Sequence, residues 1–204
     1  MVTDSLPKTD RLRAEYLRSD QMHSLALPSD DRLVGAARSL EEALATEETS
    51  RVRIACDTFL AAAAEFYDVA TPQVRVLRAR PIRVREDGWG VELFGDYHFD
   101  EKLIRVWMRT AIQKRVTSFG TFFATLCHEF CHHLDREQWG FSQTPHTRGF
   151  FERAAALYHH SRGTPLKRLY WVPMGRGQWR INWSRTNRGH KQLSGPPLSG
   201  GEPE

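Results

Sequence analysis

Cysteine is scarce in this chain of 204 residues, which holds three cysteines and no CxxC pair. An odd number cannot pair completely, and Cys127 and Cys131 are one helical turn apart, so we expect reduced thiols that pack as small core residues. Long apolar runs are missing too, because the run at 59–64 has six residues and a membrane-spanning helix needs roughly 20. The first thirteen residues carry scattered charges and no apolar stretch, so we expect no secretory signal, no membrane partner and a cytoplasmic location.

Acidic residues are absent between Arg153 and Gly201, a stretch that holds nine Lys and Arg, although the net charge of the chain is only +4. Between Lys167 and Lys191 the cations are interleaved with Tyr170, Trp171, Trp179 and Trp183. Aromatic rings among cations are typical of single-stranded nucleic-acid grooves, in which bases stack and phosphates are neutralised. The same pattern suits an extra hairpin packed on the rest of the protein, with its charges as a solvated rim, and we favour this second interpretation.

The periodicity of the apolar residues predicts an α+β fold. Apolar residues recur at helical spacing in 10–19, in 31–45 and from Ser50, a candidate N-cap, to Pro72. From residue 73 the period becomes two, which predicts a small sheet of short, mostly antiparallel strands joined by hairpins. The strands are expected at 74–76, 82–84, 89–93 and 104–108.

Two further helices are expected after the strands. Thr117 or Ser118 can cap a helix that ends near Trp139, and a second helix begins at Arg148 or the glycine after it and ends at Gly163. The inward stripe of the first of these helices is expected to be Phe122, Leu126, Phe130 and either Leu134 or His133. We divide the chain into a helical N-terminal extension at 1–49, a core at 50–163, a basic aromatic segment at 164–192 and a disordered tail at 193–204.

The residues that carry chemistry are concentrated at His128-Glu129-Phe130-Cys131-His132, an HExxH motif within a predicted helix. Two histidines four residues apart lie about 40° apart around a helix, so both imidazoles reach one side and can bind one metal ion. The glutamate between them stands beside the remaining coordination position. The motif therefore predicts a Zn2+ site with His128 and His132 as ligands and Glu129 as the catalytic base.

A catalytic zinc ion takes three protein ligands and keeps one position for water, so a third ligand must lie elsewhere in the chain. His146 is one candidate, in the loop before the last predicted helix, and Glu152 is the other, within that helix. The spacing from His132 to Glu152 equals that of the long-known zincins with a glutamate ligand. We favour His146.

An HExxH helix, a loop and then His-x-x-x-Phe at 146–150, all preceded by a small sheet, resemble the SprT-like and WLM group of zinc metallopeptidases, relatives of the minimal gluzincins. The likeness covers about half the chain, roughly 50–160. It implies a zincin-like core with His146 as the third ligand, and cysteine at the position of Cys131 is common in the group. SprT-type proteins often carry a zinc ribbon of paired CxxC motifs, which this chain lacks, so the resemblance does not carry over a DNA-repair role.

The motif and the resemblance together predict a zinc-dependent endopeptidase that acts on protein or peptide substrates. Glu129 would take a proton from a zinc-activated water and pass it to the leaving amine. By resemblance to zincins, the strand at 103–108 is expected to be the sheet edge on which an extended peptide adds as a strand, and an ordinary core strand is the equal alternative. The alternative function is a nucleic-acid-associated binding protein with a structural zinc site, or a protease recruited through its basic segment. A zinc hydrolase with a non-peptide substrate is a further possibility.

Residues beside the motif can support the site. Asp135 lies on the same helix face as His132 and could orient a ligand imidazole, but we favour a carboxylate on the helix surface. His133 projects about 100° away from His132, so we expect it at the edge of the core and not as a ligand. A donor for the developing oxyanion is also expected, and the spacing does not choose among Tyr158, Tyr97, His98 and an arginine.

Overall fold

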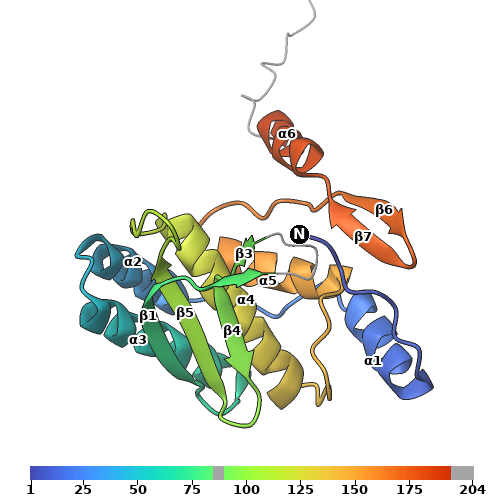
Figure 1. Cartoon of the computed structure of the whole chain (residues 1–204), viewed down its shortest axis with the longest axis horizontal. Coiled ribbons are helices and arrows are strands. Elements are labelled where there is room, and N and C mark those ends of the chain that lie inside the picture. Colours follow the sequence, from blue (N-terminus) through green and yellow to red (C-terminus); the bar gives the residue numbers. More distant parts are fainter. Residues whose placement is uncertain (85–89, 194–204) are drawn as a thin grey trace, which may run out of the picture.

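The structure is a computed structural model that describes residues 1–84 and 90–193. These residues form an α+β fold, as expected (Figure 1). The helices are α1 (Asp10–Gln21), α2 (Arg32–Ala45), α3 (Thr49–Tyr67), α4 (Phe119–Glu137), α5 (Arg148–Ser161) and α6 (Trp183–Leu193). The strands are β1 (Gln73–Ala79), β2 (Ile82–Val84), β3 (Gly90–Glu92), β4 (Gly95–His98), β5 (Leu103–Arg109), β6 (Trp171–Gly175) and β7 (Gln178–Ile181).

The main sheet has three strands in the order β1-β5-β4, which contradicts one prediction and decides between the two alternatives for the strand at 103–108. The sheet is not mostly antiparallel, because β1 and β5 run parallel, with Val74 opposite Ile104, while β4 runs antiparallel to β5, with Tyr97 opposite Ile104. For the strand at 103–108 the alternative of an ordinary core strand is confirmed, because β5 is the central strand and β4 lies at the edge. A period of two identifies a strand but not its neighbours, which is why the sequence could not predict the pairing.

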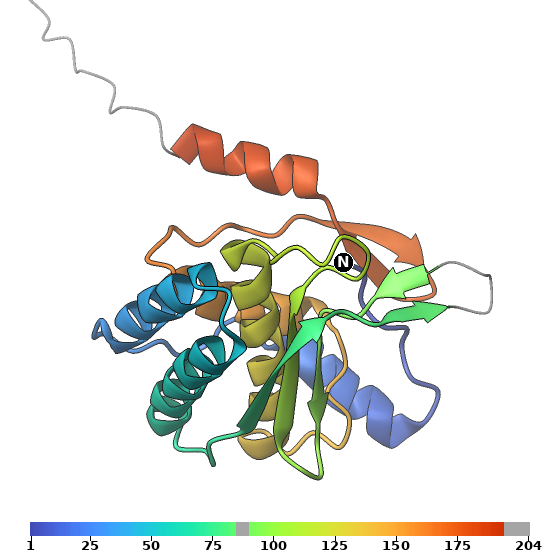
Figure 2. The same ribbon diagram turned by 60° about the vertical axis from the view of Figure 1, so that its left-hand side comes forward.

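The sheet packs against α3 and α4 on one face. Val74 and Val76 of β1 and Ile104, Val106 and Met108 of β5 point to this face and belong to one hydrophobic core with side chains of α2, α3, α4 and α5. α3 contacts β1, and α4 contacts β4 and β5 (Figure 2). The helix that carries the HExxH motif therefore lies directly behind the edge strand.

Side chains cap the N-termini of α4 and α5. Ser118 caps α4 as expected, because its Oγ accepts a hydrogen bond from the Thr121 amide at 3.3 Å. Thr147 caps α5 in the same way, accepting from the Phe150 amide at 3.0 Å. Ser50 is not the N-cap of α3, since that helix begins one residue earlier. The inward stripe predicted for α4 is confirmed, because Phe122, Leu126 and Phe130 are buried and so are both candidates for its last position, Leu134 and His133.

The first residues of the chain lie beside a hairpin formed by β6 and β7. Residues 1–3 run along β7, with an antiparallel bridge between Val2 and Arg180, and β6 and β7 form a hairpin beside them (Figure 1). The hairpin agrees with the packing interpretation of the basic aromatic segment. Beyond Leu193, the tail expected at 193–204 lies outside the described residues.

Candidate metal centre

α4 places both motif histidines on the side of the helix that faces away from its apolar stripe and toward α5. Thr144 and His146 follow in the loop 138–147, which joins the end of α4 to the start of α5. The loop turns the chain back so that His146 approaches the two helical histidines. The three residues that the sequence analysis favoured as ligands are thus brought together.

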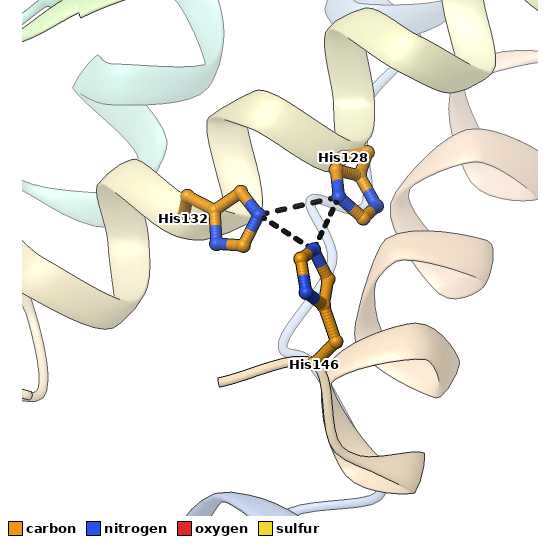
Figure 3. Close-up of side chains that lie close together, drawn as sticks. All are labelled: His128, His132 and His146. Carbon is orange, nitrogen blue, oxygen red and sulfur yellow. Dashed lines mark hydrogen bonds between the residues drawn. The ribbon is translucent and has the colours of Figure 1, made fainter. Parts of the chain in front are cut away.

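The Nε2 atoms of the three histidines form a nearly equilateral triangle. His128 Nε2 lies 3.0 Å from His146 Nε2 and 3.2 Å from His132 Nε2, and the third side is 3.1 Å. Figure 3 shows one nitrogen of each ring turned toward the other two. Each unprotonated imidazole nitrogen carries one lone pair, which lies in the plane of the ring. Three such lone pairs that point to one position can bind a cation there. These three residues could hold a metal ion.

Burial keeps two of these imidazoles neutral. Burial, with the nearby His146 as a second cause, lowers the pKa of His128 to about 3. Burial also lowers the pKa of His132 to well below its usual value, with His128 and His146 as further causes. A neutral imidazole offers a lone pair, which is the state that a metal ligand requires.

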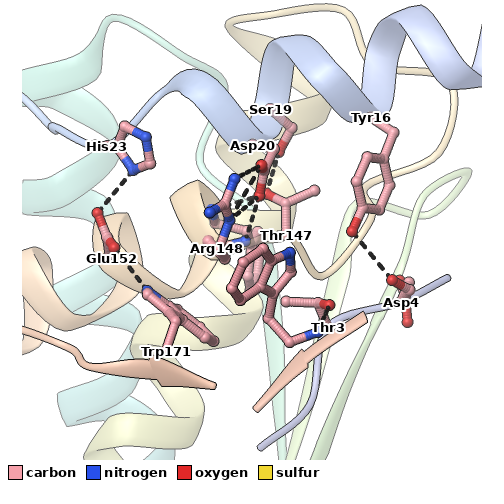
Figure 4. Close-up of polar contacts among 12 residues, drawn as sticks. Thr3, Asp4, Tyr16, Ser19, Asp20, His23, Thr147, Arg148, Glu152 and Trp171 are labelled. Atoms are coloured by element: carbon pink, nitrogen blue, oxygen red, sulfur yellow. Dashed lines mark hydrogen bonds and ion pairs between the residues drawn. The ribbon is translucent and has the colours of Figure 1, made fainter. Parts of the chain in front are cut away.

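Glu152, the other candidate for the third ligand, does not join this cluster. Its Oε1 accepts a hydrogen bond from Trp171 Nε1 at 2.9 Å, and its Oε2 lies 2.8 Å from His23 Nδ1 (Figure 4). Both carboxylate oxygens are therefore engaged, one with His23 in the segment that follows α1 and one with Trp171 of β6. The geometry favours His146 over Glu152 because α5 turns Glu152 away from the triangle.

Thr144 supports the cluster and was missed in the sequence. Its Oγ1 lies 2.7 Å from His132 Nδ1, in a buried position. Because His132 Nε2 faces the triangle, Nδ1 carries the ring proton in the neutral tautomer and donates it to the hydroxyl. Phe150 stacks on the His132 ring, with 4.4 Å between the ring centroids, and fixes its plane. The sequence does show a threonine two residues before His146. Its contact with His132 could not be predicted, because that contact depends on the conformation of the loop.

α1 holds the loop that carries His146. The Glu15 carboxylate accepts hydrogen bonds from the Ser142 amide at 2.9 Å and from the Ser142 hydroxyl at 2.8 Å. Ser19 Oγ lies 2.9 Å from Thr147 Oγ1 in a buried contact (Figure 4). The helical extension predicted at 1–49 thus contributes directly to the position of the third histidine.

Glu129 faces a cleft beside the histidines. The cleft has a volume of about 510 Å³, and Glu129, His132 and His146 line it together. Its walls also include Gly95, Asp96 and Tyr97 of β4, and Asp4, Ser5 and Pro7 of the N-terminal segment. Glu129 is 5% exposed, and in the metal-free chain burial, with Asp96 as a second cause, raises its pKa to about 8.

Asp135 has neither of the roles considered for it. It contacts no ligand imidazole and is not on the surface, because it forms an ion pair with Arg153 at 2.7 Å in which both side chains are 0% exposed. The same guanidinium donates to the backbone oxygens of Ser19, at 3.1 Å, and Met22, at 2.8 Å. The sequence placed Asp135 correctly on its helix, but the arginine that covers it comes from α5. This pair joins α1, α4 and α5 behind the site.

His133 is fully buried and binds two partners away from the triangle. Its Nε2 lies 2.7 Å from Ala70 O, and because a carbonyl can only accept, Nε2 carries the proton. Its Nδ1 must then accept from Tyr97 OH, 2.8 Å away. Tyr97 lines the cleft, yet its proton is used by His133, which argues against Tyr97 as the oxyanion donor.

Two of the other candidates for the oxyanion donor, Tyr158 and His98, do not line the cleft. Tyr158 lines a separate, mostly apolar pocket of about 250 Å³ that also contacts His128. His98 lies beside Asp96, with 3.4 Å between His98 Nε2 and the carboxylate.

Cys127 and Cys131 are buried free thiols whose pKa values are raised by burial, so their expected role as core residues is confirmed.

Most aromatic rings of the basic segment are engaged with the protein. Trp171 packs against Phe151 with 6.0 Å between the ring centroids. Trp179 lies under the Arg148 guanidinium at 4.5 Å, and Tyr170 lies under Arg185 at 4.4 Å. Trp183, by contrast, is 45% exposed. These contacts favour packing over base stacking for Trp171 and Trp179, whose partners lie outside the basic segment, whereas Arg185 belongs to it.

No protein-family model, curated protein or solved structure matches the chain. The resemblance to the SprT-like and WLM group is therefore carried by the motif residues and their spacing. Within 1–84 and 90–193, no helix combines the length and the apolar character needed to cross a membrane.

Proposed function

We propose that the protein is a zinc-dependent endopeptidase with a zincin-like core, in which His128, His132 and His146 bind the metal ion. One observation carries the proposal: three Nε2 atoms meet within 3.0–3.2 Å of one another, beside a glutamate, in a cleft. Three imidazoles suit zinc, which favours nitrogen ligands and a fourth position left for water. When bound, zinc would polarise the scissile carbonyl and lower the pKa of a water molecule to about 7.

Glu129 is the residue of this chain that would move the proton. It follows His128 directly, and its carboxylate lines the cleft together with His132 and His146. It would accept the proton of the attacking water and donate it to the leaving amine. Gly95 approaches Glu129 so closely that the carboxylate has a wall on the β4 side, which restricts its orientation.

β4 is the strand on which an extended peptide would lie. In the described part of the chain it pairs on one side with β5, and its residues Gly95, Asp96 and Tyr97 line the cleft. An extended chain can add to such an edge through backbone hydrogen bonds, with specificity from alternate side chains. A peptide in this position would have its scissile bond near Glu129. β4, and not the strand at 103–108, would then be the sheet edge to which the substrate adds.

Zinc content and proteolysis test the proposal together. The full chain should bind one zinc ion and cleave an unfolded protein substrate. His146→Ala should lose both properties, while Glu152→Ala, a matched change in the neighbouring helix, should keep the zinc. Glu129→Gln should keep the zinc and lose at least about 100-fold in turnover. Retention of zinc by His146→Ala together with its loss from Glu152→Ala would reject this ligand set.

A nucleic-acid role is the second candidate, and one observation favours it. In the described part of the chain, none of the six cations from Lys167 to Arg188 is in an ion pair with a carboxylate. Such cations can neutralise phosphates, so the protein would bind a single-stranded oligonucleotide with a strong dependence on salt. Neutralising Arg176, Arg180 and Arg185 should reduce the slope of log affinity against log salt. No binding at low salt would reject this candidate.

A further inference from the structure

The first residues of the chain lie on the C-terminal hairpin. Val2 forms an antiparallel bridge with Arg180, and the Thr3 amide donates to Trp179 O at 2.8 Å. The Trp179 amide donates in return to Thr3 Oγ1 at 2.9 Å. Residues 1–3 thus act as a third strand beside β7 (Figure 1). This pairing determines where the next residue, Asp4, is placed.

Asp4 is joined to His146 by three contacts. The Asp4 amide donates to His146 O at 2.8 Å, and the His146 amide donates to Asp4 Oδ2 at 2.8 Å. The same Oδ2 lies 3.4 Å from His146 Nδ1. Tyr16 OH donates to the backbone oxygen of Asp4 at 3.1 Å and holds it from the side of α1 (Figure 4). The carboxylate is therefore held against the edge of the imidazole that faces away from the triangle.

The position of this carboxylate matters because of the tautomer of His146. An imidazole that offers Nε2 to a metal ion carries its proton on Nδ1, and His146 Nε2 is the atom that faces the triangle. A carboxylate beside Nδ1–H favours that tautomer and fixes the orientation of the ring. His132 has an uncharged hydroxyl, Thr144, at the corresponding place. Among the described residues, Asp4 is the carboxylate that contacts a histidine of the triangle.

Building on the zinc site proposed above, we propose that Asp4 is a positioning residue for His146, so that the N-terminal segment completes the metal centre. The contacts of Glu15 with Ser142 and of Ser19 with Thr147 hold the ligand loop independently of Asp4. The side chain of Asp4 is 51% exposed, so its replacement leaves the core packing unchanged. Loss of the carboxylate should therefore act on the imidazole and not on the fold.

Zinc affinity of the full chain, measured by competition with a chelator at constant pH, tests this role. Asp4→Asn keeps an acceptor for the His146 amide and removes the charge, and Asp4→Ala removes both. Both variants should bind zinc about tenfold more weakly than the wild type. Asp10→Asn, an exposed acid at the start of α1, is the control and should bind as the wild type does. The melting temperature of the metal-free protein should differ by no more than a few degrees among the four proteins, because Asp4 is largely exposed.

The tautomer of His146 gives a second readout that a purely structural role would not change. Long-range 1H–15N NMR of the metal-free protein should show the Nδ1–H form in the wild type and a larger share of the Nε2–H form in Asp4→Asn. An unchanged tautomer, or zinc affinities of both Asp4 variants within about twofold of the wild type, would overturn the proposal.

The two proposals fail in different ways. If the wild-type chain binds no zinc, the proposed function fails, and the tautomer comparison still decides the role of Asp4. If zinc binding depends on His146 but not on Asp4, the metal site stands and the positioning role is rejected.

Discussion

Gly95 of β4 lies so close to α4 that a β-carbon on it would be 2.9 Å from Glu129 Oε1 and 2.6 Å from Thr125 Cγ2. The absence of a side chain at Gly95 lets the edge strand touch the helix that carries the HExxH motif. The Gly95 backbone consequently forms the wall of the cleft against which the side chains of Thr125 and Glu129 lie.

Replacing Gly95 by alanine should therefore disturb the site. Because Thr125 and Glu129 must move, we expect a loss of about 1–3 kcal/mol in the free energy of unfolding and at least a tenfold loss of turnover. The control is Gly35→Ala in α2, where a β-carbon would meet nothing within 4 Å. That change should stabilise the protein by about 0.5–1 kcal/mol, since alanine favours a helix. Chemical denaturation measures the free energy of unfolding of the two variants, and a peptidase assay measures their turnover. Full activity in Gly95→Ala would show that the close contact of Gly95 with Glu129 is not needed for catalysis.

Thr144 should contribute to metal affinity through His132. Thr144→Val keeps the size of the side chain and removes the hydroxyl, so the buried Nδ1–H loses its acceptor. We expect zinc binding to weaken about tenfold in Thr144→Val and to be largely retained in Thr144→Ser. Isothermal titration of the metal-free protein with zinc gives the comparison. Equal affinities for the valine and serine variants would show that the hydroxyl does not orient His132.

The buried pair of Asp135 and Arg153 should be costly to break. Asp135→Asn leaves the guanidinium buried without a compensating charge, so we expect a loss of about 3 kcal/mol in the free energy of unfolding. The matched control is Asp57→Asn, which breaks a surface pair with Arg53 at i,i+4 spacing and should cost at most about 0.5 kcal/mol. Urea denaturation measures both. Similar small losses in the two variants would mean that the buried charge is stabilised by other groups.

Glu15 should make the ligand loop sensitive to acid. Burial raises the pKa of its carboxyl, but hydrogen bonds from Ser142 and Gln143 outweigh burial and lower the pKa below its usual value. A carboxyl whose pKa is lower in the folded state contributes stability above the pKa of the unfolded chain, about 4.5, and loses it as the pH falls through the folded value.

The corresponding experiment compares Glu15→Gln with the wild type as the pH is lowered. At pH 7 the variant should be less stable by roughly 1 kcal/mol, and this difference should shrink toward pH 3, where the wild-type carboxyl is protonated. Glu42→Gln, on the exposed surface of α2, is the control and should show no such convergence. A difference that stays constant from pH 7 to pH 3 would refute the involvement of the Glu15 charge.

Local patterns were predictable and contacts between distant segments were not. The helix spacing of α4 placed His128 and His132 on one side and the apolar stripe on the other, because both follow from 3.6 residues per turn. Asp135 was placed on the correct helix but given the wrong environment, since Arg153 reaches it from α5. The strand at 103–108 was recognised, yet its two neighbours depend on chain segments whose pairing no local period encodes.

By itself, the sequence determined the α+β class, the HExxH helix and three histidines that could meet, because helix geometry and side-chain chemistry are local properties. Only the tertiary structure decided that His146 and not Glu152 joins the triangle, that β4 is the edge strand beside Glu129, and that Asp4 reaches the third histidine. Each of these facts depends on how a loop or a chain end returns to α4. The path of a loop or a chain end is determined by packing and by hydrogen bonds between residues far apart in the chain. The local sequence around each residue therefore does not predict it.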